Sequence, residues 1–199
     1  HHITDILIGL HHLGENEEFF GFKAENILSR VSETIYIYKP FQPFNTLKRI
    51  VVAVPPRAEA EPGFKHWFGK VSTISKEAGM PIIFYAAADT IRELEIIHQQ
   101  SASPVKALFK EFSDWDDFLI FSRELKPNDL FVILSSRKDQ VSYNPQLTKL
   151  PHYLSNYFQK YSFIILYPKQ QDQFLGQTAD TVFEDTGPKK IGTMRKVGN

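Results

Sequence analysis

The sequence predicts an α/β protein with a parallel β-sheet and helices on both faces of that sheet. Short runs rich in Ile, Val and Phe alternate along the chain with segments whose apolar residues recur at helical spacing. The short runs are nearly continuous in apolar character, which is typical of strands buried on both faces. In order, the predicted strands are 5–9, 34–39, 49–54, 81–86, 130–134 and 163–167.

The predicted helices cover 63–78, 90–99, 115–125 and a segment after Pro151. Gly79 is a suitable end for the first of them. We expect Asp89 and Asp114 to cap the next two helices, and Pro127 to close the third. The buried side of the last helix is expected to contain Leu154, Tyr157, Phe158 and Tyr161.

Composition excludes several classes of protein. A chain of 199 residues can bury a full core. Lys+Arg and Asp+Glu both number 23, so no basic field indicates nucleic acid as a partner. The absence of cysteine excludes disulfides, thiolate metal sites and thiol catalysis. No apolar run approaches the roughly 18 residues that span a bilayer, so we expect a soluble region without direct membrane insertion.

Two stretches of the chain, 5–40 and 129–168, share an order of features. Each has Asp, a buried strand, a polar loop, a helix containing Leu-Ser, and an aromatic-rich strand ending in Tyr and Pro. We interpret them as repeats of one unit. The expected organisation is a strand–helix–strand remnant of a first domain at 1–40, a linker at 41–46, a complete second domain at 47–168, and a tail or arm at 169–199.

The loop after the first strand contains the candidate ligand-binding residues, which are Gly9, His11, His12, Gly14 and Gly21. Glycines let a backbone approach a phosphate, and the amides of a following helix would help to bind it. Three nearby glutamates would repel phosphate, however, and a turn that needs flexible residues is the competing interpretation. The two histidines are adjacent and point oppositely on a strand end, so we expect no metal site there.

The other loops show fewer features of a ligand-binding or catalytic site. In 135–145, Arg137 and Lys138 could bind an anion, but a solvated loop is the expectation because the loop has no glycine. In 54–63, two prolines remove N–H donors, and Glu59 and Glu61 have no visible partner that would make them an acid or a base. No nucleophile elbow, HExxH or Walker motif is present, so we expect no catalytic residues and no enzyme.

The stretch 5–40 resembles the closing half of a universal stress protein, an adenine-nucleotide-binding α/β fold. The phosphate loop of that family is G-x2-G-x9-G-[ST], in which Gly9 matches the first position and Gly21 can stand for the last glycine. His12 replaces the second glycine and Phe22 replaces the hydroxyl residue. These departures argue against ATP or AMP as a ligand, so no cofactor is expected.

A closer resemblance covers nearly the whole chain. The stretches NTLKRIVVAVPPRAEAEPGF (45–64), SDWDDFLIFSREL (113–125) and LSSRKDQVSYNP (134–145) resemble the C-terminal region of bacterial monovalent cation/proton antiporters of type 2. In those proteins a transmembrane transport domain precedes tandem stress-protein-like domains. The resemblance implies a regulatory domain of a sodium or potassium/proton antiporter, at the cytoplasmic face of the inner membrane, with the transport domain of the same polypeptide as its partner.

Two other classes remain open. One is a stand-alone universal-stress-type protein that binds adenine nucleotides, and the other is a hydrolase or transferase on the same scaffold. For 47–168 we expect the strand order 3-2-1-4-5, from the right-handed crossover rule and from the resemblance to universal stress proteins. Universal stress proteins, which the chain resembles, commonly dimerise through their last strand, so the resemblance implies that 34–39 pairs antiparallel with 163–167. We also expect the free edge of 5–9 to recruit a second molecule and form a homodimer. The C-terminal arm is expected to lie along its own domain or a neighbouring chain.

Overall fold

The computed structural model describes residues 5–10 and 27–170. In chain order the strands are β1 (Asp5–Gly9), β2 (Thr34–Lys39), β3 (Arg49–Ala53), β4 (Ile82–Ala86), β5 (Ala107–Glu111), β6 (Asp129–Leu134) and β7 (Ser162–Tyr167). The α-helices are α2 (Phe64–Ala78), α3 (Ala88–Gln99), α4 (Phe121–Glu124) and α5 (Leu150–Tyr157). Short 3₁₀ helices are η1 (Phe44–Thr46), η2 (Ala58–Ala60), η3 (Trp115–Ile120) and η4 (Pro145–Lys149).

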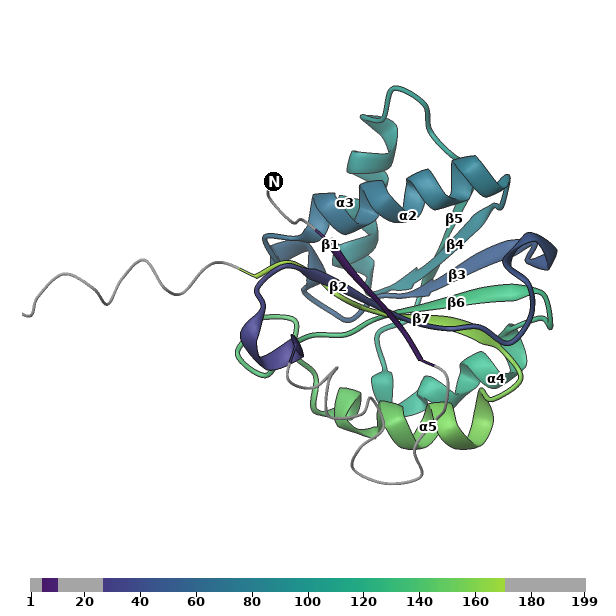
Figure 1. Ribbon diagram of the computed structural model, residues 1–199. Helices are drawn as coiled ribbons and strands as arrows, with labels where there is room; N and C mark the ends of the chain where they lie inside the picture. The colour runs from purple at the N-terminus through teal and green to yellow at the C-terminus, as the bar shows by residue number, and fades with distance from the viewer. Residues whose placement is uncertain (1–4, 11–26, 171–199) are drawn as a thin grey trace, which may run out of the picture.

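The described strands form one seven-stranded sheet in the order β1-β2-β7-β6-β3-β4-β5. α2 and α3 lie on one face of this sheet, and α4 and α5 lie on the other (Figure 1). The predicted α/β class with helices on both faces is therefore correct. Within 47–168 the sheet order, read from the β5 edge, is β5-β4-β3-β6-β7, and all of these pairs are parallel. Counted along this region of the chain, these are its third, second, first, fourth and fifth strands, which confirms the predicted order 3-2-1-4-5.

The pairing of β2 with β7 is the antiparallel one in this sheet, as predicted for 34–39 and 163–167. Its ladder is centred on Ile37, which lies opposite Ile165, and both side chains are 0% exposed. β1 then pairs in parallel with β2 and forms one edge of the sheet. The antiparallel junction therefore joins two parallel sets of strands into a continuous sheet.

Each face of the sheet covers a separate hydrophobic core. The core under α2 and α3 includes Trp67, Phe68 and Val71, which lie on the buried face of α2. The core over α4 and α5 is rich in aromatic rings. In that core, Phe131 of β6 lies 5.1 Å from the ring of Phe121 and 5.5 Å from the ring of Phe158, measured between centroids.

The prediction missed β5 and misplaced several helix ends. β5 is a half-exposed edge strand with Leu108 57% exposed, so it lacks the continuous apolar run of a buried strand. α3 begins at Ala88 after the N-cap Ala87, so Asp89 lies in the first turn rather than at the cap. There Asp89 pairs with Arg92.

The predicted helix over 115–125 is two shorter elements. Asp114 does cap the first, because its Oδ1 accepts a hydrogen bond from the Asp116 N–H at 2.9 Å. This element is a 3₁₀ helix with a break at Asp117, and a single α-helical turn follows. Leu154 of α5 and Phe158, which follows the helix, are buried as predicted, whereas Tyr157, the last residue of α5, is 51% exposed.

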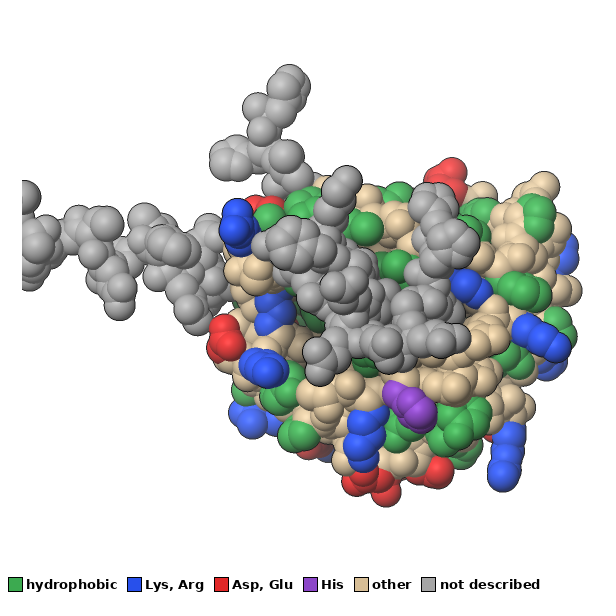
Figure 2. All heavy atoms as spheres, turned by 60° about the horizontal axis from the view of Figure 1, so that its bottom comes forward, with side chains coloured by type: hydrophobic (Ala, Val, Ile, Leu, Met, Phe, Trp, Pro, Cys, Tyr) green, Lys and Arg blue, Asp and Glu red, His purple; other side chains and the backbone are tan. Residues whose placement is uncertain are grey.

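Charged side chains are dispersed over the surface that carries α4 and α5. On the described part of the face in Figure 2, Lys and Arg side chains stand apart from one another among acidic and apolar ones. They form no continuous basic field in that view. The surface on this side therefore follows the even balance of charges in the sequence.

Candidate functional site

The carboxyl ends of β3 and β6 mark the place where a sheet of this order is expected to bind a ligand. From β3 the chain proceeds outward through β4 to β5, and it then returns to the other side of β3 as β6. In open α/β sheets, ligands bind outside the carboxyl ends of the strands at such a reversal. In this chain the loops 54–63 and 135–145 follow those two strand ends.

Buried polar contacts fix the loop after β3. Glu61 is 6% exposed, and its Oε1 accepts a hydrogen bond from the Ser142 backbone N–H at 2.9 Å. Glu59 Oε2 accepts one from the Thr90 hydroxyl at 2.6 Å. Glu61 therefore ties the two loops together instead of belonging to a solvated charged loop, and both glutamates have partners that the sequence did not reveal.

Arg57 turns this loop with an unusual backbone conformation. Its φ is 66° and its ψ is 14°, a left-handed conformation that costs a residue with a side chain about 1–2 kcal/mol. Pro55 and Pro56 precede it and carry no N–H. The backbone directly after β3 therefore presents few donors to a phosphate.

The Arg137 side chain lies half-buried in the loop after β6. Its Nη2 donates to the backbone oxygen of Glu33 at 3.4 Å, while Nε and Nη1 are buried without a protein hydrogen-bond partner. Burial lowers the pKa of this guanidinium, and the nearby Tyr167 and Asp139 act in the opposite direction. Arg137 is thus packed against the structure, whereas the sequence predicted a solvated loop.

The space between the two loops is almost filled. A cavity of about 10 Å³ lies against Glu61, Arg137 and Tyr167, which is about the volume that one water molecule requires. The chain after β7 closes the adjacent side. A Cβ atom at Gly63 would stand 2.7 Å from the backbone nitrogen of Lys169. Nucleotide-sized ligands need cavities of roughly 300 Å³ or more, so this part of the described structure has no room for one.

Among the candidate residues of the first loop, the structure describes Gly9. Gly9 is exposed, ends β1 and is aligned with Tyr38 of β2. Because β2 runs antiparallel to β7, Gly9 lies at the opposite end of the sheet from the loop 135–145. The remaining candidates are outside the described residues, namely His11, His12, Gly14 and Gly21. Of these candidates, the described one, Gly9, therefore lies apart from the loop 135–145.

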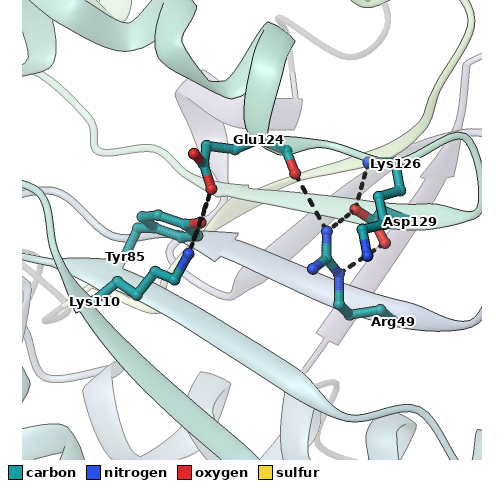
Figure 3. A network of polar contacts seen from close by, with 6 residues as sticks. All are labelled: Arg49, Tyr85, Lys110, Glu124, Lys126 and Asp129. Atoms are coloured by element: carbon teal, nitrogen blue, oxygen red, sulfur yellow. Dashed lines mark hydrogen bonds and ion pairs between the residues drawn. The ribbon is translucent and has the colours of Figure 1, made fainter.

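A polar network that the sequence did not predict joins β3, β4, β5, β6 and α4 (Figure 3). Arg49 Nε donates to Asp129 Oδ1 at 2.9 Å, and Arg49 Nη2 pairs with Asp129 Oδ2. The same Nη2 donates to the backbone oxygen of Glu124 at 3.3 Å. The Glu124 carboxylate accepts from the Tyr85 hydroxyl at 2.7 Å and pairs with Lys110 Nζ at 3.4 Å.

The hydrogen bonds of this network shift the pKa values of Tyr85, Glu124 and Lys110. Burial and the hydrogen bond to Glu124 raise the pKa of Tyr85. That same hydrogen bond lowers the pKa of Glu124, and the hydrogen bond to Tyr85 raises the pKa of Lys110. These shifts stabilise the neutral hydroxyl of Tyr85, the carboxylate of Glu124 and the ammonium group of Lys110.

A second cluster ties the edge strand β1 to α2. Asp5 Oδ1 lies 2.8 Å from His66 Nε2, and Asp5 Oδ2 lies 3.0 Å from Lys70 Nζ. The Tyr36 hydroxyl donates to the same carboxylate at 3.3 Å. Burial, ahead of the Asp5 charge, raises the pKa of Tyr36. The cluster holds the start of β1 against the helix layer.

Comparisons with known proteins identified no family for this chain. No model of a known protein family matches the chain, and a search of curated proteins found no match. None of the described helices is long and apolar enough to cross a membrane. The described residues contain no cluster of three or more His, Asp or Glu side chains suited to a metal ion.

Proposed function

We propose that this chain is the cytoplasmic regulatory portion of a bacterial monovalent cation/proton antiporter, and that it acts by binding rather than by catalysis. The proposal rests on how the three stretches that resemble such proteins meet in the fold. In the stretch 45–64, Arg49 contacts Glu124 of 113–125 at 3.3 Å. In the same stretch, Glu61 accepts a hydrogen bond from Ser142 of 134–145 at 2.9 Å. Because the stretch 45–64 contacts both other stretches, the resemblance extends over one folded unit.

The strand pairs β1–β2 and β6–β7 support the further proposal of tandem stress-protein-like units, the first of them present as its closing part. The parallel ladders end in equivalent pairs, Gly9 with Tyr38 and Leu134 with Leu166. One more hydrogen bond continues each ladder. The Leu10 N–H donates to Tyr38 O and the Ser135 N–H donates to Leu166 O, each at 2.8 Å. The antiparallel β2–β7 junction relates the two pairs by a local two-fold axis.

The exposed edge of β1 supports the proposal of a homodimer. Its counterpart β6 pairs on the corresponding side with β3. β1 has no neighbour on that side among the described strands. As a consequence Leu7 is 71% exposed, whereas Val132, its equivalent in the ladder, is 2% exposed. Unpaired edges of this kind template pairing with another strand.

The substitution Leu7→Pro tests this partner. N–H groups alternate between the two sides of a strand, and the Leu10 N–H points to β2, so the Leu7 N–H points to the free edge. Proline removes that donor without removing a β1–β2 hydrogen bond. We expect light scattering to show a dimer for the parent chain and a monomer for Leu7→Pro, with Leu7→Val as the control that stays dimeric. A parent chain that is monomeric at high micromolar concentration would disprove the homodimer.

Transport measurements test the proposed function itself. The full-length protein that contains this chain would be expressed in bacteria that lack their own antiporters. In everted vesicles, a pH-sensitive dye would report proton movement on addition of sodium or potassium. We expect cation-dependent exchange whose half-saturating cation concentration shifts at least two-fold in Glu61→Ala, which unties the loops 54–63 and 135–145. Glu95→Ala, an exposed change on α3, is the matched control. Absence of exchange refutes the antiporter proposal, and identical kinetics at equal protein levels refute the regulatory role.

Calorimetry separates this proposal from a stand-alone nucleotide-binding protein. The loops at the carboxyl ends of β3 and β6 leave a cavity of about 10 Å³, so we expect ATP and AMP to bind weakly or not at all. Titration of each nucleotide into the full chain should give no saturable heat below about 1 mM. A dissociation constant in the low micromolar range would favour the nucleotide-binding alternative.

A further inference from the structure

A groove on the outer side of α2 is not used by the contacts described above. It has a volume of about 460 Å³ and is lined by α2 on one side and by the end of α3 with the following turn, up to Val105, on the other. Phe68, Ile97 and Val105 supply apolar surface, and Lys65 and Lys76 lie towards its two ends. No carboxylate is among its lining residues. The groove therefore combines an apolar floor with positive charge.

Two details of α2 favour an occupant. Gly69 lies inside the helix, where glycine costs about 1 kcal/mol relative to alanine. No packing requires it, because a Cβ atom there would meet nothing within 4 Å. The Ser72 hydroxyl, which also lines the groove, is buried and has no hydrogen-bond partner. A costly glycine that opens a hollow and an unused hydroxyl beside it are typical of a surface shaped for contact.

The charge and shape of the groove indicate an acidic, partly apolar peptide segment. The groove is open to solvent rather than enclosed, which suits a peptide better than a small molecule. Lys65 and Lys76 are 11 residues apart on one helix, and at about 1.5 Å per residue their backbones are about 16 Å apart. An extended peptide covers that distance in about five residues.

The chain itself contains a segment of this composition. Residues 180–185 read DTVFED, with Val182 and Phe183 between acidic residues. Asp185 is five positions after Asp180, which is the spacing that the two lysines require. These residues lie outside the described part of the structure, so the assignment rests on the groove, on this sequence and on where the described chain ends.

The described chain ends beside the Lys65 end of α2. The backbone of Lys169 packs against Gly63, the residue that precedes α2, and the Gln170 N–H donates to the Ser32 backbone oxygen at 2.8 Å. From Gln170, ten residues reach Asp180, and an extended stretch of that length spans about 33 Å. α2, with 15 residues, is about 22 Å long. The segment can therefore reach every part of the groove from its own chain.

We propose that the groove between α2 and the end of α3 binds residues 180–185 of the same chain, with the Phe183 side chain over Gly69 and the acidic residues facing Lys65 and Lys76. This contact does not depend on the antiporter assignment. It would be a releasable contact, because the charge pairs are exposed and each contributes only up to about 1 kcal/mol.

Disulfide cross-linking tests the proposal, since the sequence contains no cysteine. Ser101 lines the groove and is exposed, and Ser101→Cys is combined with Thr186→Cys next to the acidic segment. The matched control replaces Thr186→Cys by Thr193→Cys, seven residues further along the same tail. In dilute, oxidised full-length chain we expect the intramolecular disulfide with Thr186→Cys to form at least ten times faster than with the control.

Charge reversal completes the test. Lys65→Glu with Lys76→Glu should remove the difference in rate, as should Phe183→Ala in the tail. Equal rates for the two cysteine pairs, or a difference that survives the charge reversal, would overturn the proposal. Disulfides that form only between molecules would also overturn it and would assign the groove to a second copy of the chain. Circular dichroism on each variant checks that the fold is retained.

Discussion

Substitution of Asp129 tests how the ion pair with Arg49 stabilises the starts of the neighbouring strands β3 and β6. Its side chain is 2% exposed and accepts hydrogen bonds from Arg49 Nε at 2.9 Å, from Arg49 Nη2 and from the Lys126 N–H at 2.7 Å. Arg49 is 21% exposed, and the hydrogen bond to Asp129 raises the pKa of its guanidinium. The pair is therefore mostly withdrawn from water.

Asp129→Ala leaves a guanidinium and a backbone N–H without their main acceptor. Removing one partner of a buried pair costs about 3–5 kcal/mol. Because Arg49 keeps partial access to water and its contact with Glu124 O, we expect the lower end of that range, about 3 kcal/mol. The double variant Arg49→Ala with Asp129→Ala should lose about 1–3 kcal/mol less than the sum of the two single variants, because neither charge is then left alone.

Urea denaturation followed by circular dichroism measures these free energies of unfolding. Asp89→Ala is the matched control, since it removes an ion pair with Arg92 whose partners are 80% and 71% exposed. We expect the control to cost less than about 1 kcal/mol. A cost below 1 kcal/mol for Asp129→Ala, or strict additivity in the double variant, would refute the assignment of this pair as a buried, coupled interaction.

Two further predictions concern glycine positions and pH. Gly63→Ala should destabilise the chain by about 1–3 kcal/mol, because its Cβ atom would stand 2.7 Å from the Lys169 backbone nitrogen. Gly69→Ala should instead stabilise α2 by up to about 1 kcal/mol, because a Cβ atom there meets nothing within 4 Å. Urea midpoints that move in the same direction for the two variants would contradict this pair of predictions. The folded pKa of Glu124 is lowered, chiefly by the Tyr85 hydrogen bond, so its contribution to stability is present above the unfolded value of about 4.3 and is lost as pH falls through the lower folded value. Glu124→Gln should therefore weaken the loss of stability between about pH 5 and 3, and an unchanged acid profile would argue against this hydrogen bond.

The order and direction of the strands followed from the sequence because both depend on local signals and general rules. Continuous apolar runs mark strands buried on both faces, and right-handed crossovers then limit their order. The antiparallel β2–β7 pairing followed from the repeat together with the resemblance to universal stress proteins, which commonly dimerise through this strand. β5 was missed because an edge strand with one exposed face has no such run.

The repeat itself is offset by one residue from its alignment by letters. The sequence matches Asp5 with Asp129, but the ladders match Asp5 with Leu130, since these residues align with Thr34 and Ser162 at the starts of β2 and β7. A shift of one residue reverses the face of every side chain in a strand. Asp5 therefore faces α2, where it meets His66, while Asp129 meets Arg49.

The polar contacts of the site could not be predicted from the sequence, for a different reason. Glu61 accepts its hydrogen bond from a backbone N–H that lies 81 residues further along the chain, and no residue type marks such a donor in advance. The Arg49–Asp129 pair was nearer to prediction. Both residues begin neighbouring parallel strands and are aligned in the register, so their opposite charges at strand starts were the available signal.

β2 links the two ends of the sheet where the sequence predicted separate binding loops. At its start, Glu33 contacts Arg137 through the backbone and Lys169 through an ion pair at 3.4 Å. At its other end, Lys39 Nζ donates to the Gln159 backbone oxygen at 2.5 Å. The strand between these points is almost fully buried and is paired on both sides, so it cannot bend independently of its neighbours. β2 therefore holds the Glu33–Arg137 contact at one end and the Lys39–Gln159 contact at the other in a fixed relation to each other.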